Sequence, residues 1–160
     1  MSIAIRVARP SDAAAIATIY MPYVTDTVIS FEMAPPDKAE MANRLAKTLA
    51  RFPWLVAESD GEVVGYAYAG QHRERAAYQW SADVSVYVHK ALQRRGIGER
   101  ALRIIMHAAQ ADALPVRLQV IKGNTAKRLY DRLGFEVVGE DDQLFHMRRA
   151  PRAPVEIKAE

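Results

Sequence analysis

The sequence contains no cysteine and only four histidines among its 160 residues. Without cysteine, the chain cannot form disulfides or zinc–thiolate sites and cannot use a cysteine nucleophile. The histidines at 72, 89, 107 and 146 show no metal-ligand spacing and have no clustered carboxylate pair. We therefore expect no metal.

Long apolar runs are also missing. No run reaches the roughly 18 consecutive apolar residues of a membrane span, and the first residues alternate like a strand, unlike a signal peptide. These features predict a cytoplasmic protein with no membrane association. Basic and acidic residues are interspersed, 22 against 19, so we expect no nucleic-acid partner. The isoelectric point near 9.3 keeps a salt-sensitive nucleic-acid-binding module as an alternative.

Half of the residues are hydrophobic, which suffices for one sizeable core. We expect a single domain over residues 1–149. Residues 150–160 carry two prolines and little apolar surface, which predicts a disordered tail.

The hydrophobic pattern predicts alternating strands and helices. Strands are expected near residues 3–8, 54–58, 62–69, 83–89, 115–121, 135–139 and 143–148, and residues 25–36 are expected to form a loop. Helices are expected after the N-caps Ser11, Asp37 and Asn124 and from Ile97 onward. Ser59-Asp60-Gly61 predicts a hairpin turn, and Gly134 is expected to cap the last helix.

The segment Gln93-Arg94-Arg95-Gly96-Ile97-Gly98 stands between a β-branched strand and an apolar-periodic helix. Unpaired N–H groups and the dipole at a helix start attract anions, and glycine lets a phosphate approach the backbone. A dinucleotide site needs its first glycine directly after the strand and an acid about 20 residues later, which this chain lacks, and a P-loop needs Gly-Lys-Ser/Thr. A pyrophosphate site and a solvated glycine-rich turn both remain open.

Two further side chains are candidates for acid–base chemistry. Alternation places Asp83 on the polar face of its strand, where it could act as a general base or simply pair with an arginine or face water. Tyr130 lies on the buried stripe of its helix. A phenol with a pKa of about 10 suits a departing thiolate, but the same position also suits a core tyrosine with a satisfied hydroxyl.

These residues together resemble the GNAT family of N-acetyltransferases. Residues 93–98 are similar to its acetyl-CoA signature Q/R-x-x-G-x-G/A, and residues 124–135 are similar to its N-x-A-x-x-L-Y-x-x-L-G-F helix. The resemblance spans residues 3–149. The front half is similar to the phosphinothricin and methionine sulfoximine acetyltransferases through Ile19-Tyr20 and residues 28–32, 66–70, 75–78 and 86–89.

The resemblance implies a fold and a donor site. The fold is α/β (α+β), with a mixed, largely antiparallel sheet that splays at the acetyl-CoA cleft between about four helices. Acetyl-CoA is the implied co-substrate, with no metal. Its implied contacts are Val86, Tyr87, Val88, Arg94, Arg95, Gly96, Ile97, Gly98, Glu99, Asn124, Lys127 and Tyr130.

The resemblance also implies direct transfer to an amine. Asp83 would take the ammonium proton and Tyr130 would protonate the leaving thiolate. A backbone N–H near Tyr87 or Val88 would stabilise the oxyanion. The resembled subfamily usually carries a glutamate at position 83, so the shorter aspartate is expected to act through a water.

The implied acceptor is a small amino-acid-like amine. Arg75, and after it Arg73, would bind its anionic groups, with Phe31, Glu32 and Tyr78 as pocket walls; the alternative is a solvated basic loop. The resembled subfamily also implies a homodimer. The hairpin over residues 138–145 is shorter than in that subfamily. A peptide or protein α-amine or a polyamine is the alternative acceptor, and a non-catalytic acyl-CoA-binding domain is the alternative class.

Overall fold

The computed structural model describes residues 2–27, 32–71 and 82–151. Its strands are β1 (Ala4–Val7), β2 (Trp54–Ser59), β3 (Glu62–Gln71), β4 (Ala82–Val88), β5 (Val116–Ile121), β6 (Glu136–Glu140) and β7 (Leu144–Arg149). Its helices are α1 (Ala13–Thr25), α2 (Lys38–Leu49), α3 (Ile97–Ala111) and α4 (Lys127–Arg132). Each predicted strand and helix is confirmed, with shifts at several ends.

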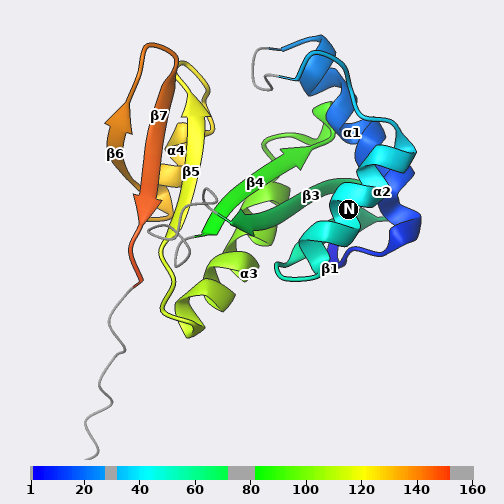
Figure 1. Cartoon of the computed structure of the whole chain (residues 1–160), viewed down its shortest axis with the longest axis horizontal. Coiled ribbons are helices and arrows are strands. Elements are labelled where there is room, and N and C mark those ends of the chain that lie inside the picture. The colour runs from blue at the N-terminus through cyan, green and yellow to red at the C-terminus, as the bar shows by residue number, and fades with distance from the viewer. Residues whose placement is uncertain (1, 28–31, 72–81, 152–160) are drawn as a thin grey trace, which may run out of the picture.

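The seven strands form one sheet in the order β1-β2-β3-β4-β5-β7-β6. Among the described strands, β4 and β5 alone are parallel neighbours, and every other pairing is antiparallel. The expected mixed, largely antiparallel sheet with four helices is therefore confirmed. Figure 1 shows β5, β7 and β6 diverging from the half built on β4.

Helices cover both faces of the sheet. One core cluster joins α1 and α2 to Trp54, Val56 and Tyr66, and another joins α3 to Ala67, Val84 and neighbouring residues. Because side chains alternate along a strand, the two clusters lie on opposite faces. The predicted apolar face of β4 thus packs on α3, and its Asp83 face points toward α1 and α2.

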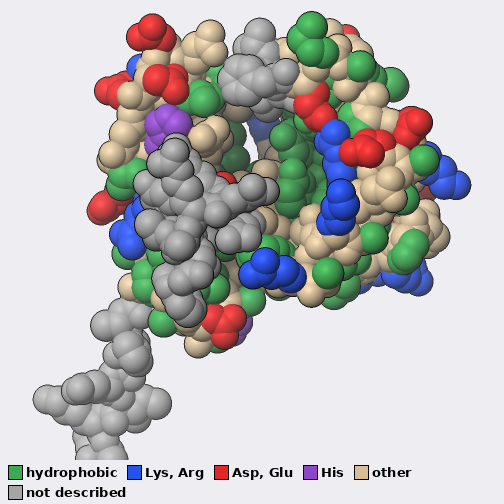
Figure 2. All heavy atoms as spheres, viewed as in Figure 1, with side chains coloured by type: hydrophobic (Ala, Val, Ile, Leu, Met, Phe, Trp, Pro, Cys, Tyr) green, Lys and Arg blue, Asp and Glu red, His purple; other side chains and the backbone are tan. Residues whose placement is uncertain are grey.

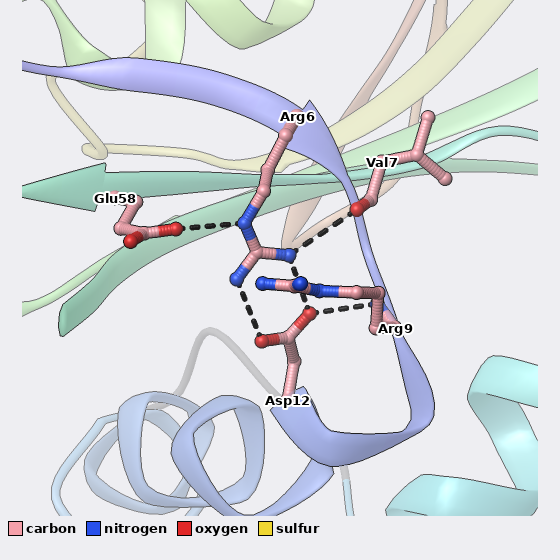
Figure 3. A network of polar contacts seen from close by, with 5 residues as sticks. All are labelled: Arg6, Val7, Arg9, Asp12 and Glu58. Carbon is pink, nitrogen blue, oxygen red and sulfur yellow. Dashed lines mark hydrogen bonds and ion pairs between the residues drawn. The ribbon is translucent and has the colours of Figure 1, made fainter. Parts of the chain in front are cut away.

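The entry to α1 differs from the expectation. Pro10–Asp12 form a short 3-10 turn, so α1 begins at Ala13, and Ser11 is not its N-cap. Asp12 is buried and accepts bonds from the Arg6 guanidinium at 2.8 and 2.9 Å and from the Arg9 N–H at 2.7 Å (Figure 3). Arg6 also donates to Glu58 on β2. Tertiary pairing of Asp12 with β1 therefore decides where the helix starts.

Two local predictions are confirmed in the next elements. The Asp37 carboxylate accepts the Glu40 N–H at 2.8 Å and caps α2. Asp60 and Gly61 both have positive φ, as a two-residue hairpin turn requires, and they connect β2 to β3.

The start of α4 is later than predicted. Its first residue is Lys127, and the Asn124 side chain accepts the Ala126 N–H at 2.9 Å in a turn that precedes the helix. Asn124 therefore shapes the approach to α4 and is not its N-cap. Gly134, with φ +90°, follows the helix as expected.

The expected tail lies mostly outside the described residues, which end at Pro151. No helix in the described part of the chain combines the length and the apolar character that crossing a bilayer requires.

Candidate active site

A cleft of about 840 Å³ opens where β4 and β5 separate. The two strands pair only at Ala82–Val116 and Asp83–Arg117 and then diverge. The cleft is lined by the rest of β4, by β5, by the start of α3 and by the segment from Asn124 to Arg132. Figure 2 shows the surface hollowed between the two halves of the molecule. Its volume suits a ligand of cofactor size.

The turn before α3 forms one end of this cleft. Arg94 has φ +65° and Gly96 has φ +77°, and α3 starts at Ile97 with no side-chain cap. The N–H groups of the first helical turn, from Ile97 to Glu99, therefore lack intrahelical acceptors. Because no side-chain cap occupies them, they are available to an anion. The predicted pyrophosphate cradle coincides with this uncapped helix start, and anion binding there stays a prediction.

Close packing fixes α3 against the sheet. A Cβ on Gly98 would lie 3.1 Å from Val86 Cγ2, and a Cβ on Gly65 would lie 3.3 Å from Ile97 Cγ2 and 3.2 Å from the Tyr87 carbonyl oxygen. Ile97 itself is buried. Glycine at 65 and 98 therefore lets the helix start touch β3 and β4. The sequence pattern singled out Gly98 but gave no signal for Gly65.

The free edge of β4 supplies backbone groups to the cleft. His89 N–H bonds Val64 on β3, while Ala82 N–H bonds Pro115 next to β5. Because the direction of backbone groups alternates along a strand, Val86 and Val88 point their N–H groups toward the β5 side. β5 has diverged there, so these groups face the cleft. Tyr87 is paired with Tyr66 of β3 and directs its own N–H away from the cleft.

The Tyr87 side chain contributes to the site instead. Its ring packs edge-on against Tyr20 and Tyr23 of α1, each at a centroid distance of 5.1 Å, and it lines the cleft. Burial raises the pKa of Tyr87 well above its ordinary value. The hydroxyl therefore stays protonated at neutral pH.

Asp83 is half-buried and lines the cleft where the strands part. Its register partner on β5 is Arg117, so the two side chains share one face of the sheet. The Nε of Arg117 is buried and has no hydrogen-bond partner among the described residues. A carboxylate and a guanidinium thus stand together on the face that points toward α1 and α2.

Tyr130 reaches the cleft from the β5 side. Its ring packs edge-on against Phe135 at 6.0 Å, and burial raises its pKa to about 12. The tyrosine belongs both to the core and to the cleft lining. Packing therefore fixes the ring while the residue lines the cleft, and its role as proton donor stays a prediction.

Some of the charged residues predicted to bind the donor line the cleft, and others do not. The Glu99 carboxylate pairs with Arg103 at 2.8 Å and with Arg132 of α4 at 3.1 Å, and these arginines lower its pKa, Arg103 most strongly. Lys127 directs its ammonium to Asp131 and the Phe145 ring. Arg94, Glu99, Arg128 and Arg132 line the cleft, whereas Arg95 and Lys127 do not.

Of the predicted acceptor residues, only Glu32 is described. Its carboxylate accepts hydrogen bonds from the Tyr20 hydroxyl and from Arg44 of α2, the latter at 2.5 Å. Arg44 is the first cause of a lowered Glu32 pKa. Phe31, Arg73, Arg75 and Tyr78 lie outside the described residues.

The sequence did not identify Tyr23 as a site residue. Its hydroxyl donates to the Val88 carbonyl at 2.6 Å and accepts from Gln93 Nε2 at 2.6 Å, and it lines the cleft. The helical spacing of Ile16, Ile19, Tyr20 and Tyr23 indicates one core-facing stripe, and Tyr23 does lie in the core. Arg128 and Arg132 also line the cleft, but they occupy variable positions of the helix motif, so the sequence did not identify them as site residues.

Comparison with known proteins places the chain among acetyltransferases. The family described as Acetyltransferase (GNAT) domain matches residues 5–149. A phosphinothricin N-acetyltransferase of Alcaligenes faecalis is 39% identical over 141 residues, which cover 84% of this chain and 71% of that protein. An L-methionine sulfoximine/L-methionine sulfone acetyltransferase of Pseudomonas paraeruginosa is 36% identical over 151 residues, which cover 90% and 86%.

The fold is also similar to that of a solved acetyltransferase structure. A phosphinothricin acetyltransferase of the GNAT superfamily from Sinorhizobium meliloti, in complex with acetyl-CoA, superposes with a TM-score of 0.86 at 28% identity. The match covers 94% of this chain and 89% of that one.

Proposed function

The chain belongs to the GNAT acetyltransferase family and is an N-acetyltransferase, and we propose that it moves the acetyl group of acetyl-CoA to the amine of a small amino-acid-like acceptor. The parting of β4 and β5 after Asp83 is the observation that carries the proposal. It leaves a strand edge, a helix N-terminus and two candidate acid–base groups around one cleft.

The donor site follows from the backbone. The first-turn N–H groups of α3 would bind the pyrophosphate, helped by the charge of Arg94. The cleft-facing groups of Val86 and Val88 would pair with the pantetheine arm as an added strand. The nearby guanidiniums of Arg128 and Arg132 add positive charge along the same cleft.

Direct transfer requires an uncharged amine. The amine nitrogen bonds to the thioester carbonyl carbon, and holding the two reactants together can lower the barrier by several kcal/mol. A cleft-facing N–H of β4, that of Val86 or Val88, would stabilise the developing oxyanion. Asp83, through a water, takes the proton that the amine loses. As the carbon–sulfur bond breaks, Tyr130 donates its proton to the thiolate, and free CoA leaves as the thiol.

The relatives support an acceptor that carries a carboxylate. Two of them are described as acting on phosphinothricin and on methionine sulfoximine or sulfone. Arg73 and Arg75 stay the predicted cations for the acidic groups of such a molecule. Arg117 adds a third candidate, because it is the register partner of Asp83 and its buried Nε lacks a hydrogen-bond partner within the described chain. Cytoplasmic location and a homodimer also stay predictions.

A thiol-release screen tests the proposal. The full chain with acetyl-CoA is offered phosphinothricin, methionine sulfoximine, methionine sulfone, ordinary amino acids, polyamines and short peptides with free N-termini. We expect the highest kcat/KM with the first three compounds and loss of turnover in Tyr130→Phe.

Other outcomes of the screen would overturn parts of the proposal. Preference for peptides or polyamines would reject the amino-acid-like acceptor. Calorimetric binding of acetyl-CoA with no turnover on the whole panel would reject catalysis.

A further inference from the structure

Tyr23 joins two parts of the donor site that are separate in sequence. Its hydroxyl donates to the carbonyl of Val88, the last residue of β4, and accepts from the amide of Gln93, which opens the turn before α3. Both bonds are 2.6 Å long. The tyrosine comes from α1, which is 65 residues before Val88. One phenol therefore links the end of the strand to the pyrophosphate turn.

The connection that Tyr23 spans has few supports of its own. Residues Lys90–Leu92 form a 3-10 turn that is capped by His89, and the turn contains no buried residue. Lys90 pairs with Asp26 at 3.3 Å, but both side chains are exposed, so this pair contributes little. Tyr23, by contrast, is only 6% exposed. The bonds through Tyr23 are thus the best-protected link described across this connection.

Tyr20 provides an internal comparison. It lies one helical turn before Tyr23, and both rings pack edge-on against Tyr87 at the same 5.1 Å. The two hydroxyls diverge, because Tyr20 bonds Glu32 and Tyr23 bonds Val88 and Gln93. Helix α1 therefore directs one phenol toward the predicted acceptor wall and the other toward the donor turn.

We propose that Tyr23 is a positioning residue for the donor, which holds the pyrophosphate turn against the end of β4. The end of β4 and the turn before α3 line the cleft side by side, so the pyrophosphate and the adjoining part of the donor bind in register only while these two segments keep their spacing. Without the hydroxyl, Gln93 loses its partner and the turn loosens. The inference rests on donor use of this cleft and is independent of the acceptor.

Calorimetric titration of the full chain with CoA tests the inference. We expect Tyr23→Phe to raise the Kd for CoA and the KM for acetyl-CoA about fivefold, the factor that one net hydrogen bond supports. Tyr20→Phe is the matched control, because it removes a hydroxyl from the same helix and the same Tyr87 contact. It should leave the CoA Kd within about twofold of wild type and raise the acceptor KM instead.

Gln93→Leu removes the same link without altering the buried phenol. It should also raise the Kd for CoA, and the double variant should be no weaker than Tyr23→Phe alone, since Tyr23→Phe already breaks the bond that Gln93 makes. If Tyr23→Phe does not fold, Gln93→Leu alone decides the question.

Two results would reject the inference. One is a CoA Kd in Gln93→Leu and Tyr23→Phe that stays within about twofold of wild type. The other is an equal rise of both KM values in Tyr23→Phe, which would indicate general loosening. A wild-type chain that does not bind CoA would instead reject the donor site itself.

Discussion

Asp83 on β4 and Arg117 on β5 are register partners at the last point where the two strands pair. Beyond them the strands diverge and the cleft begins. Strand pairing therefore places the candidate base where the cleft begins, on the same sheet face as an arginine. The point where β4 and β5 part is thus also the position of the proposed general base, Asp83.

Substitution of Asp83 tests the base. We expect Asp83→Asn to lower kcat by about 100-fold or more, because the amide is similar in size but cannot take a proton. Asp83→Glu restores a carboxylate on a longer side chain and should recover part of the activity. The measurement is thiol release at saturating acetyl-CoA. Wild-type kcat in Asp83→Asn would exclude a role for this carboxylate in proton transfer.

Tyr130→Phe tests the acid. Burial raises the pKa of Tyr130 to about 12, so its hydroxyl should keep its proton over the whole range in which the enzyme is stable. Removing it should lower kcat by about 100-fold, while the ring still packs on Phe135 and the thermal midpoint changes little. The wild-type rate should show no decline from this group up to about pH 11. A variant with normal kcat would leave Tyr130 as a core residue only.

Gly96→Ala tests the cradle, and Gly61→Ala is its control. Both glycines have positive φ, +77° and +81°, and a Cβ on either meets no atom within 4 Å. Each variant should therefore lose roughly 1 kcal/mol of unfolding free energy from backbone strain alone. Only Gly96→Ala should raise the Kd for CoA, because Gly96 lines the cleft in the predicted pyrophosphate turn and Gly61 does not. Equal CoA affinity in the two variants would contradict the placement of the anion.

Glu32→Gln tests the acceptor wall, with Glu40→Gln as its control. Both carboxylates pair with Arg44, but Glu32 also accepts from Tyr20, and Glu40 is the more exposed. We expect Glu32→Gln to raise the acceptor KM about fivefold and to leave the KM for acetyl-CoA unchanged. Glu40→Gln should change neither constant, since exposed i,i+4 pairs contribute little. A matching effect of the two variants on acceptor KM would argue against a specific role for Glu32.

Asp12→Asn tests the support beneath α1 (Figure 3). The Arg6 hydrogen bonds, opposed by burial, hold the pKa of Asp12 below its ordinary value of 3.8. A lowered pKa in the folded state stabilises the protein fully above that ordinary value, and this stabilisation is lost as pH falls through the folded-state pKa. We expect Asp12→Asn to cost about 2–3 kcal/mol at pH 7 by urea unfolding.

The difference between wild type and Asp12→Asn should shrink in acid, below about pH 4. Asp26→Asn, which breaks the exposed pair with Lys90, should leave stability unchanged at either pH. A difference for Asp12→Asn that persists unchanged in acid would show that charge pairing is not the source of its effect.

Much of the local architecture could be predicted because its causes are local. The Asp37 cap, the Asp60-Gly61 turn and the glycine-bearing start of α3 depend on residues within four positions of one another. The N-caps predicted at Ser11 and Asn124 were wrong, because tertiary and turn contacts set these two helix starts. Asp12 accepts hydrogen bonds from Arg6 of β1, and α1 begins only after it. The Asn124 side chain closes a turn that precedes α4.

The contacts that complete the site lie far apart in the chain. Tyr23 meets Val88 across 65 residues and Gln93 across 70, and Glu32 meets Arg44 across 12. Periodicity placed Tyr23 in the core, but it could not assign a partner to the hydroxyl. The same limit applies to Gly65, whose missing Cβ matters only because α3 packs against β3 there.

By itself, the sequence determined the alternation of strands and helices, the glycine-bearing turn before α3 and the candidate acid–base pair, because spacing along the backbone governs these features. Tertiary structure decided where β4 and β5 part, which backbone groups face the cleft and which of two neighbouring tyrosines bonds the turn before α3. These depend on strand pairing and on close packing between distant segments. Local patterns in one sequence do not reveal such contacts, because they form only when the whole chain folds.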